Sequence, residues 1–122
     1  MRRFRFDATT GHAITQFGSE RAAITGIQRT TAPVQIACMH IGAGGVVGYH
    51  QATTRQLFLV VAGDGWVTGA DRVQHPLSAG EAAFWDAGEW HESGSVSGMT
   101  VIVIEGNELV PDQAMRATPL AE

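Results

Sequence analysis

The sequence contains no lysine and a single cysteine, Cys38. All eight basic residues are arginines, so Schiff-base chemistry and a phosphate-binding P-loop lysine are excluded. One thiol cannot form an intrachain disulfide or a redox-active thiol pair, and it cannot build a zinc site from CxxC pairs.

Cationic charge and long apolar runs are also scarce. Twelve acidic residues against eight arginines give a net charge of -4, so we expect no nucleic-acid partner. The longest apolar run, residues 57–62, is too short to cross a bilayer, and we expect no membrane association. The basic N-terminal segment is followed by Asp7 and polar residues instead of an apolar stretch, so we expect no signal peptide and a cytoplasmic location.

What the chain does contain is typical of one small all-β domain spanning residues 1–122. Fifteen glycines separate short segments rich in Val, Ile, Phe and Trp. We expect a hairpin turn at 62–65 and a helical turn within 108–116. Residues 99–104 are apolar at nearly every position, which predicts burial on both faces. The expected strands are 34–41, 56–61, 66–68, 73–77, 82–85 and 99–105.

Both ends of the chain flank this set of strands. Phe4-Arg5-Phe6 alternates apolar and charged side chains, which predicts an N-terminal strand. Exposed terminal strands often pair with another subunit, so we predict a homodimer. Residues 117–122 are expected to form a loose tail.

Two of the five histidines stand out because each follows a glycine-containing turn and opens an expected strand. These are His50 and His91, whereas His12, His40 and His75 are expected to be packing residues. Side chains alternate along a strand, so Gln56 shares a face with Phe58 and Val60. If that face lines a barrel, Gln56 converges with His50, and His91 and Ser93 join from the opposite wall.

Two spaced motifs carry a family resemblance. Gly44-x5-His50-x-Ala52-x3-Gln56-x6-Gly63 resembles the first cupin motif, G-x5-H-x-H-x3,4-E-x6-G. Gly80-x5-Asp86-x-Gly88-x2-His91-x3-Ser95 resembles the second, G-x5-P-x-G-x2-H-x3-N. Every interval is intact over residues 34–104. The resemblance implies a small single-domain cupin, an antiparallel β-barrel of the jelly-roll or double-stranded β-helix type.

Two of the departures from these motifs fall on the expected metal ligands. In the cupins that this chain resembles, two His and one Glu of the first motif and one His of the second bind a divalent metal. Here Ala52 stands at the second His and Gln56 replaces the Glu. The resemblance therefore implies a reduced metal site of His50, Gln56 and His91, for Zn, Ni, Fe, Mn or Cu. Without a carboxylate, we expect a bound dication to keep its full charge and to favour an anionic ligand.

Three functional hypotheses follow. The first is a metalloenzyme of dioxygenase, isomerase or decarboxylase type, a choice that rests on the resemblance. The second is a metal-free barrel that binds or senses a small molecule without catalysis. The third is a cofactor-free isomerase with His50 or His91 as general base. In each, a small organic ligand occupies a pocket formed by Ala52, Phe58, Val60, Trp85 and Ser93.

Overall fold

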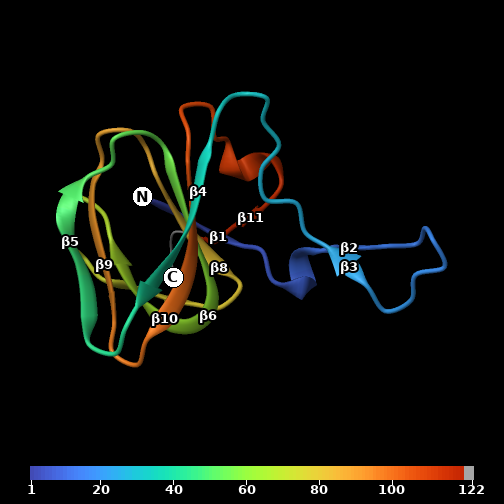
Figure 1. Ribbon diagram of the computed structural model, residues 1–122, viewed down its shortest axis with the longest axis horizontal. Coiled ribbons are helices and arrows are strands. Elements are labelled where there is room, and N and C mark those ends of the chain that lie inside the picture. The colour runs from blue at the N-terminus through green and yellow to red at the C-terminus, as the bar shows by residue number, and fades with distance from the viewer. Residues whose placement is uncertain (120–122) are drawn as a thin grey trace.

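In the computed structural model, which describes residues 1–119, nearly all regular structure is β, as predicted (Figure 1). The described chain has two three-residue 3-10 turns, η1 (Ala8–Thr10) and η2 (Pro111–Gln113), and no helix with the length and hydrophobicity of a membrane span. The strands are β1 (Arg2–Arg5), β2 (His12–Ala13), β3 (Ala23–Ile24), β4 (Gln35–Ile41), β5 (Gly45–Gln51), β6 (Gln56–Thr68), β7 (His75–Ser78), β8 (Glu81–Trp85), β9 (Trp90–Ser95), β10 (Met99–Glu105) and β11 (Arg116–Ala117).

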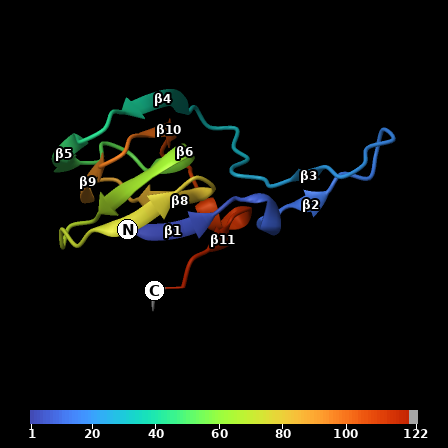
Figure 2. The same cartoon turned by 90° about the horizontal axis from the view of Figure 1, so that it is seen from below.

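The body of the molecule consists of two facing layers of antiparallel strands (Figures 1 and 2). The larger layer has the order β11-β1-β8-β6-β10-β4. In the smaller layer β9 lies between β5 and the second half of β6, and β7 pairs with β6 on its other side. The predicted jelly-roll arrangement of antiparallel sheets is therefore confirmed.

Strand β6 belongs to both layers, and the hairpin turn predicted at 62–65 is wrong. Its first half pairs with β8 and β10, and its second half pairs with β7 and β9. Gly63, at φ 77°, lies where a Cβ would be 2.3 Å from the Gly98 carbonyl oxygen. A bulge in the pairing with β10 lies beside it, between Thr100 and Val101. Glycine permits this backbone conformation and close approach, so the chain bends from one layer into the other without reversing.

Alternate side chains of the larger layer enter two different cores. Between the layers, Phe58, Val60 and Trp85 are buried with Val101 and Val103. On the outer face, a second core contains Phe4, Leu57, Leu59, Phe84, Leu109 and Met115. Because Ile102 and Ile104 pack on that second core, the predicted burial of residues 99–104 on both faces is confirmed.

The two ends of the chain pair with each other. Strand β1 lies between β8 and β11, so the edge that was predicted to pair with another subunit is already occupied within the chain. The homodimer remains a prediction, but an unpaired N-terminal strand no longer supports it. Thr118 donates its backbone N–H to the Arg3 carbonyl at 2.8 Å, so the predicted loose tail is ordered here, and residues 120–122 lie outside the described residues.

A hairpin of β2 and β3 extends away from the two layers (Figures 1 and 2). Its tip carries Phe17, whose side chain is 93% exposed. The chain returns along the second core, where Ile27 packs, before it enters β4. This arm lies apart from the histidines of β5 and β9, which are at the other end of the molecule (Figure 1).

The closest approach of β6 and β9 gives a stability prediction. A Cβ at Gly65 would lie 2.2 Å from the Gly94 carbonyl oxygen, which is backbone and cannot turn away. We expect Gly65→Ala to lower the free energy of unfolding by about 1–3 kcal/mol, measured by chemical denaturation. Gly48→Ala is the matched control, because nothing lies within 4 Å of a Cβ there. Equal denaturation midpoints for the two variants would contradict this account.

Candidate metal site

His50 and His91 form a cross-strand pair in the smaller layer. Their Cα atoms are partners in the pairing of β5 with β9, and their ring centroids are 4.4 Å apart. Two expectations are corrected here. His50 is the penultimate residue of β5 instead of its first, and His91 lies beside it instead of on the opposite wall. The antiparallel register of β5 and β9 is the reason, because it sets the end of one strand against the start of the other.

Backbone carbonyls hold both imidazoles in one tautomer. Nδ1 of His50 lies 2.6 Å from the Gly48 oxygen, and Nδ1 of His91 lies 3.1 Å from the Glu89 oxygen. A carbonyl oxygen can only accept, so Nδ1 carries the proton in each ring. In the neutral rings each Nε2 therefore keeps a free lone pair. Metal-binding histidines are oriented in this way by outer-shell hydrogen bonds.

The two rings differ in their surroundings. His50 is exposed, whereas His91 is 3% exposed and stacks on Trp85 at a centroid distance of 4.2 Å. Burial is the main reason that the pKa of His91 lies below its ordinary value of 6.5, and the nearby His50 shifts it in the same direction. His91 is thus held as a neutral base.

The facing layer contributes Gln56 and a carboxylate that the sequence analysis missed. Glu105, Gln56 and Trp85 are successive Cα partners across β10, β6 and β8. The Gln56 Nε2 donates to Oε1 of Glu105 at 3.1 Å. Alternation from Val101 and Val103 was the available signal, because it places Glu105 on the same inner face. The partner of Glu105 depended on strand register, which the sequence did not reveal.

A small cavity of about 30 Å³ lies between the layers at this point. It has room for a water molecule or an ion, and a larger ligand must reach it from the open side, where His50 is exposed. Of the predicted pocket residues, Phe58 and Ser93 line it, whereas Ala52, Val60 and Trp85 belong to the inner core. The full lining is Met39, Val47, His50, Gln56, Phe58, His91 and Ser93.

The donors at this cavity fit a metal incompletely. Among residues 1–119, no group of three or more His, Cys, Asp or Glu side chains is arranged to hold an ion. The cavity does present two imidazoles and a neutral amide. Imidazole-rich sets suit Zn, Cu, Ni and Fe, whereas Mn prefers oxygen ligands. By donor type these residues therefore suit a transition metal, with two histidines and one neutral amide as the candidate ligands.

The other three histidines are separate from this cavity. His12 and His40 are exposed, which corrects their assignment as packing residues, and His75 is half-buried in β7. His12 lies on the arm and His40 lies on the edge strand β4. Exposure of these strands explains the difference, since neither is covered by another layer at those positions.

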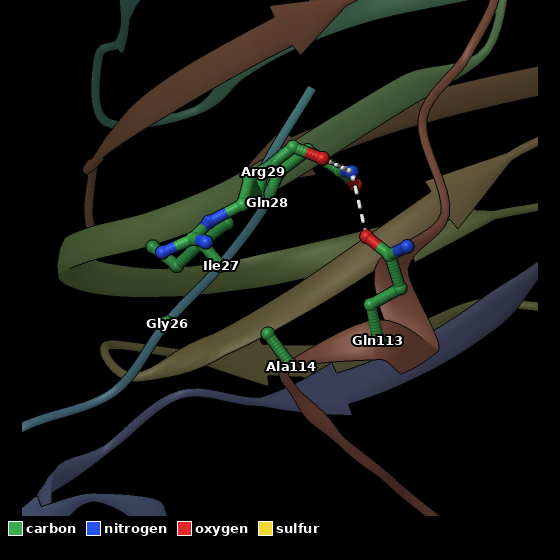
Figure 3. Close-up of a pocket in the computed structure, with 6 residues that line it drawn as sticks. All are labelled: Gly26, Ile27, Gln28, Arg29, Gln113 and Ala114. Atoms are coloured by element: carbon green, nitrogen blue, oxygen red, sulfur yellow. Dashed lines mark hydrogen bonds between the residues drawn. The ribbon is translucent and has the colours of Figure 1, made fainter. Parts of the chain in front are cut away.

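A larger cavity, of about 560 Å³, lies on the outer side between residues 26–29 and the C-terminal segment (Figure 3). There the Gln28 amide donates to the Arg29 carbonyl and to Gln113, while its oxygen accepts from the Val110 N–H. These bonds join two segments that cover the second core. The Gln28 amide is thus used within the chain, and we assign this cavity a structural role.

The buried imidazole gives a pH prediction for the metal-free protein. Because burial holds the pKa of His91 below 6.5, the unfolded chain takes up this proton first as the pH falls. The free energy of unfolding is then expected to decrease below about pH 6.5 and to level off once the folded protein is also protonated. NMR titration with a chelator present measures the pKa directly. His91→Gln should lose this part of the pH dependence, and an unchanged profile would contradict the assignment.

Comparison with known proteins places this geometry in a family. A family model described as a cupin domain matches residues 37–107. No curated protein matches the chain. A predicted oxalate decarboxylase from Thermotoga maritima has 22% identity and a TM-score of 0.52, with 57% of this chain and 62% of that chain covered. A conserved Streptococcus pyogenes protein of unknown function has 16% identity and a TM-score of 0.55, with coverages of 63% and 66%.

A cupin superfamily protein from Desulfitobacterium hafniense has 17% identity and a TM-score of 0.56, with 71% of this chain and 79% of that chain covered. The chain spans less than two thirds of the T. maritima and S. pyogenes proteins, and at these identities the likeness shows the fold. The family match covers more than half of the chain and includes His50, His91 and the strands of both predicted motifs. The chain therefore belongs to the cupin family.

Proposed function

We propose that the protein binds a divalent transition metal through Nε2 of His50 and Nε2 of His91, with the Gln56 amide oxygen as the third donor. The observation that carries the proposal is the pair of Nδ1 contacts to backbone carbonyls, which leaves both Nε2 lone pairs free. When bound, the metal would supply a Lewis acid that polarises a ligand oxygen.

The cavity supports an ion with open coordination positions. Three protein donors leave at least one position of a four-coordinate metal for water or another ligand. The exposed side of His50 is the side from which a small organic ligand would approach. We propose binding of metal and ligand as the function, and dioxygenase or isomerase chemistry as the reaction classes to assay once a ligand is known.

A metal-free small-molecule barrel is the second candidate. It is favoured by the incomplete donor set, since residues 1–119 contain no arrangement of three His, Cys, Asp or Glu side chains around an ion. In that case Nε2 of His50 and of His91 would act as hydrogen-bond acceptors or as a general base. The third hypothesis, a cofactor-free isomerase, becomes the enzymatic form of this candidate.

Titration calorimetry with Zn²⁺ and Ni²⁺ tests the metal proposal. We expect roughly one equivalent to bind, and His50→Ala and His91→Ala each to weaken the affinity by about tenfold or more, because each removes one of two imidazoles. His12→Ala is the matched control, since this exposed histidine lies on the arm. Variants that bind as tightly as the parent would place the metal elsewhere.

The same titration separates the two candidates. If the parent binds neither Zn²⁺ nor Ni²⁺ at micromolar concentrations, the metal proposal fails. Thermal-shift measurements with small carboxylates, in the presence of a chelator, then test the metal-free barrel. His50→Ala should abolish any shift that arises at this cavity.

A further inference from the structure

We propose that Glu105 supplies the negative charge of the metal site. Glu105 is a positioning residue: its carboxylate orients the side chain of Gln56, and Gln56 binds the metal. The inference rests on the proposed metal site and deepens it, because the charge of the site decides which ligands it prefers.

The inward direction of Glu105 follows from the two cores. On β10, Val101 and Val103 are buried in the core between the layers, whereas Ile102 and Ile104 pack on the outer core. Alternation continues to the last residue of the strand, so Glu105 shares the face of Val101 and Val103. Its half-buried carboxylate thus lies in the row that ends the inner core, beside Gln56.

The contact with Glu105 determines how the Gln56 amide is turned. The hydrogen bond of 3.1 Å runs from Gln56 Nε2 to Glu105 Oε1. A carboxylate only accepts, so the amide nitrogen faces Glu105 and the amide oxygen is left for another partner. Gln56 also lines the cavity with His50 and His91. The bond therefore selects the amide orientation in which oxygen is available as a third donor.

The same contact places a charge one strand away from the motif position. Gln56 occupies the position of the glutamate in the first cupin motif, and Glu105 is its direct partner on β10. Neighbouring strands are about 4.8 Å apart, and the hydrogen bond polarises the amide so that its oxygen becomes a stronger donor to a cation. The chain thus pairs the amide of Gln56 with the carboxylate of Glu105, and the amide is the group of the two that lines the cavity.

On this proposal, a bound dication does not keep its full charge. With neutral imidazoles and Gln56, the carboxylate of Glu105 reduces the charge of the occupied site from +2 to +1. A monoanion, such as a monocarboxylate or an enolate, would make the site neutral. Monoanionic organic acids are therefore the ligand class that this site would favour over dianions.

The decisive variant is Glu105→Gln, which removes the charge at nearly constant shape. We expect Zn²⁺ affinity in titration calorimetry to fall by about tenfold, the effect typical of losing a group that orients a ligand. Glu108→Gln is the matched control, because it makes the same change of net charge at an exposed position beyond β10. Denaturation midpoints of both variants show whether each is folded.

A transposed pair distinguishes this role from a structural one. In the double variant Gln56→Glu, Glu105→Gln, the amide at 105 can donate to the carboxylate at 56, so the hydrogen bond is kept and reversed. We expect Zn²⁺ affinity to return to the parent value or to exceed it. If Glu105→Gln is poorly folded, the Zn²⁺ affinity of the double variant is compared with that of Gln56→Glu alone. This comparison is informative because the single change sets two carboxylates in contact.

The outcomes separate this inference from the metal proposal. A parent that binds Zn²⁺, with Glu105→Gln binding equally well, overturns the role of Glu105 and leaves the metal site standing. Loss of affinity in Glu105→Gln without recovery in the folded double variant also overturns it. If the parent has no Zn²⁺ affinity, both the metal proposal and the role of Glu105 fail, and the histidine variants then show no loss of affinity.

Discussion

The passage of β6 from one layer into the other is the constraint on which the site depends. Its first residue, Gln56, lies against β8 and β10, and its last, Thr68, lies against β9. The buried Trp85 Nε1 donates to the Thr68 carbonyl at 3.0 Å, and the Thr68 hydroxyl accepts from the Glu92 N–H. The first of these bonds links the layers beside His91, which stacks on Trp85. The glycines at the bend let β6 pass close to Gly94 on β9 and to Met99 on β10.

The donors are divided between the layers. Both imidazoles come from β5 and β9, whereas the amide and carboxylate come from β6 and β10. The distance between layers therefore controls how the four groups meet, and the stacking of His91 on Trp85 helps to hold it. Preorganisation of this kind matters more here than in a site with four strong ligands, because two histidines and an amide bind a cation weakly unless they are already in place.

The success and failure of individual strand predictions have a common physical origin. Residues 99–105 were predicted with the observed bounds because a doubly buried strand is apolar throughout, which is a local signal. Residues 62–65 were predicted as a hairpin because Gly-Asp-Gly is typical of tight turns. The same glycines form a bend when the segment has partners on both sides. Two of those partners, β9 and β10, are distant in sequence. The N-terminal strand was likewise predicted, but its neighbours β8 and β11 were not.

The sequence alone determined the all-β class and the cupin resemblance, and it predicted His50, Gln56 and His91 as the candidate site, because motif spacing and strand alternation are properties of the chain itself. Tertiary structure decided which groups meet. Strand register sets His50 beside His91 and Glu105 beside Gln56. Hydrogen bonds to the backbone carbonyls of Gly48 and Glu89 fix the imidazole tautomers. Strand register depends on hydrogen bonds between residues far apart in the chain, so a local pattern cannot encode it. Each tautomer depends on a carbonyl only two residues away, but the direction of that carbonyl follows from the folded backbone.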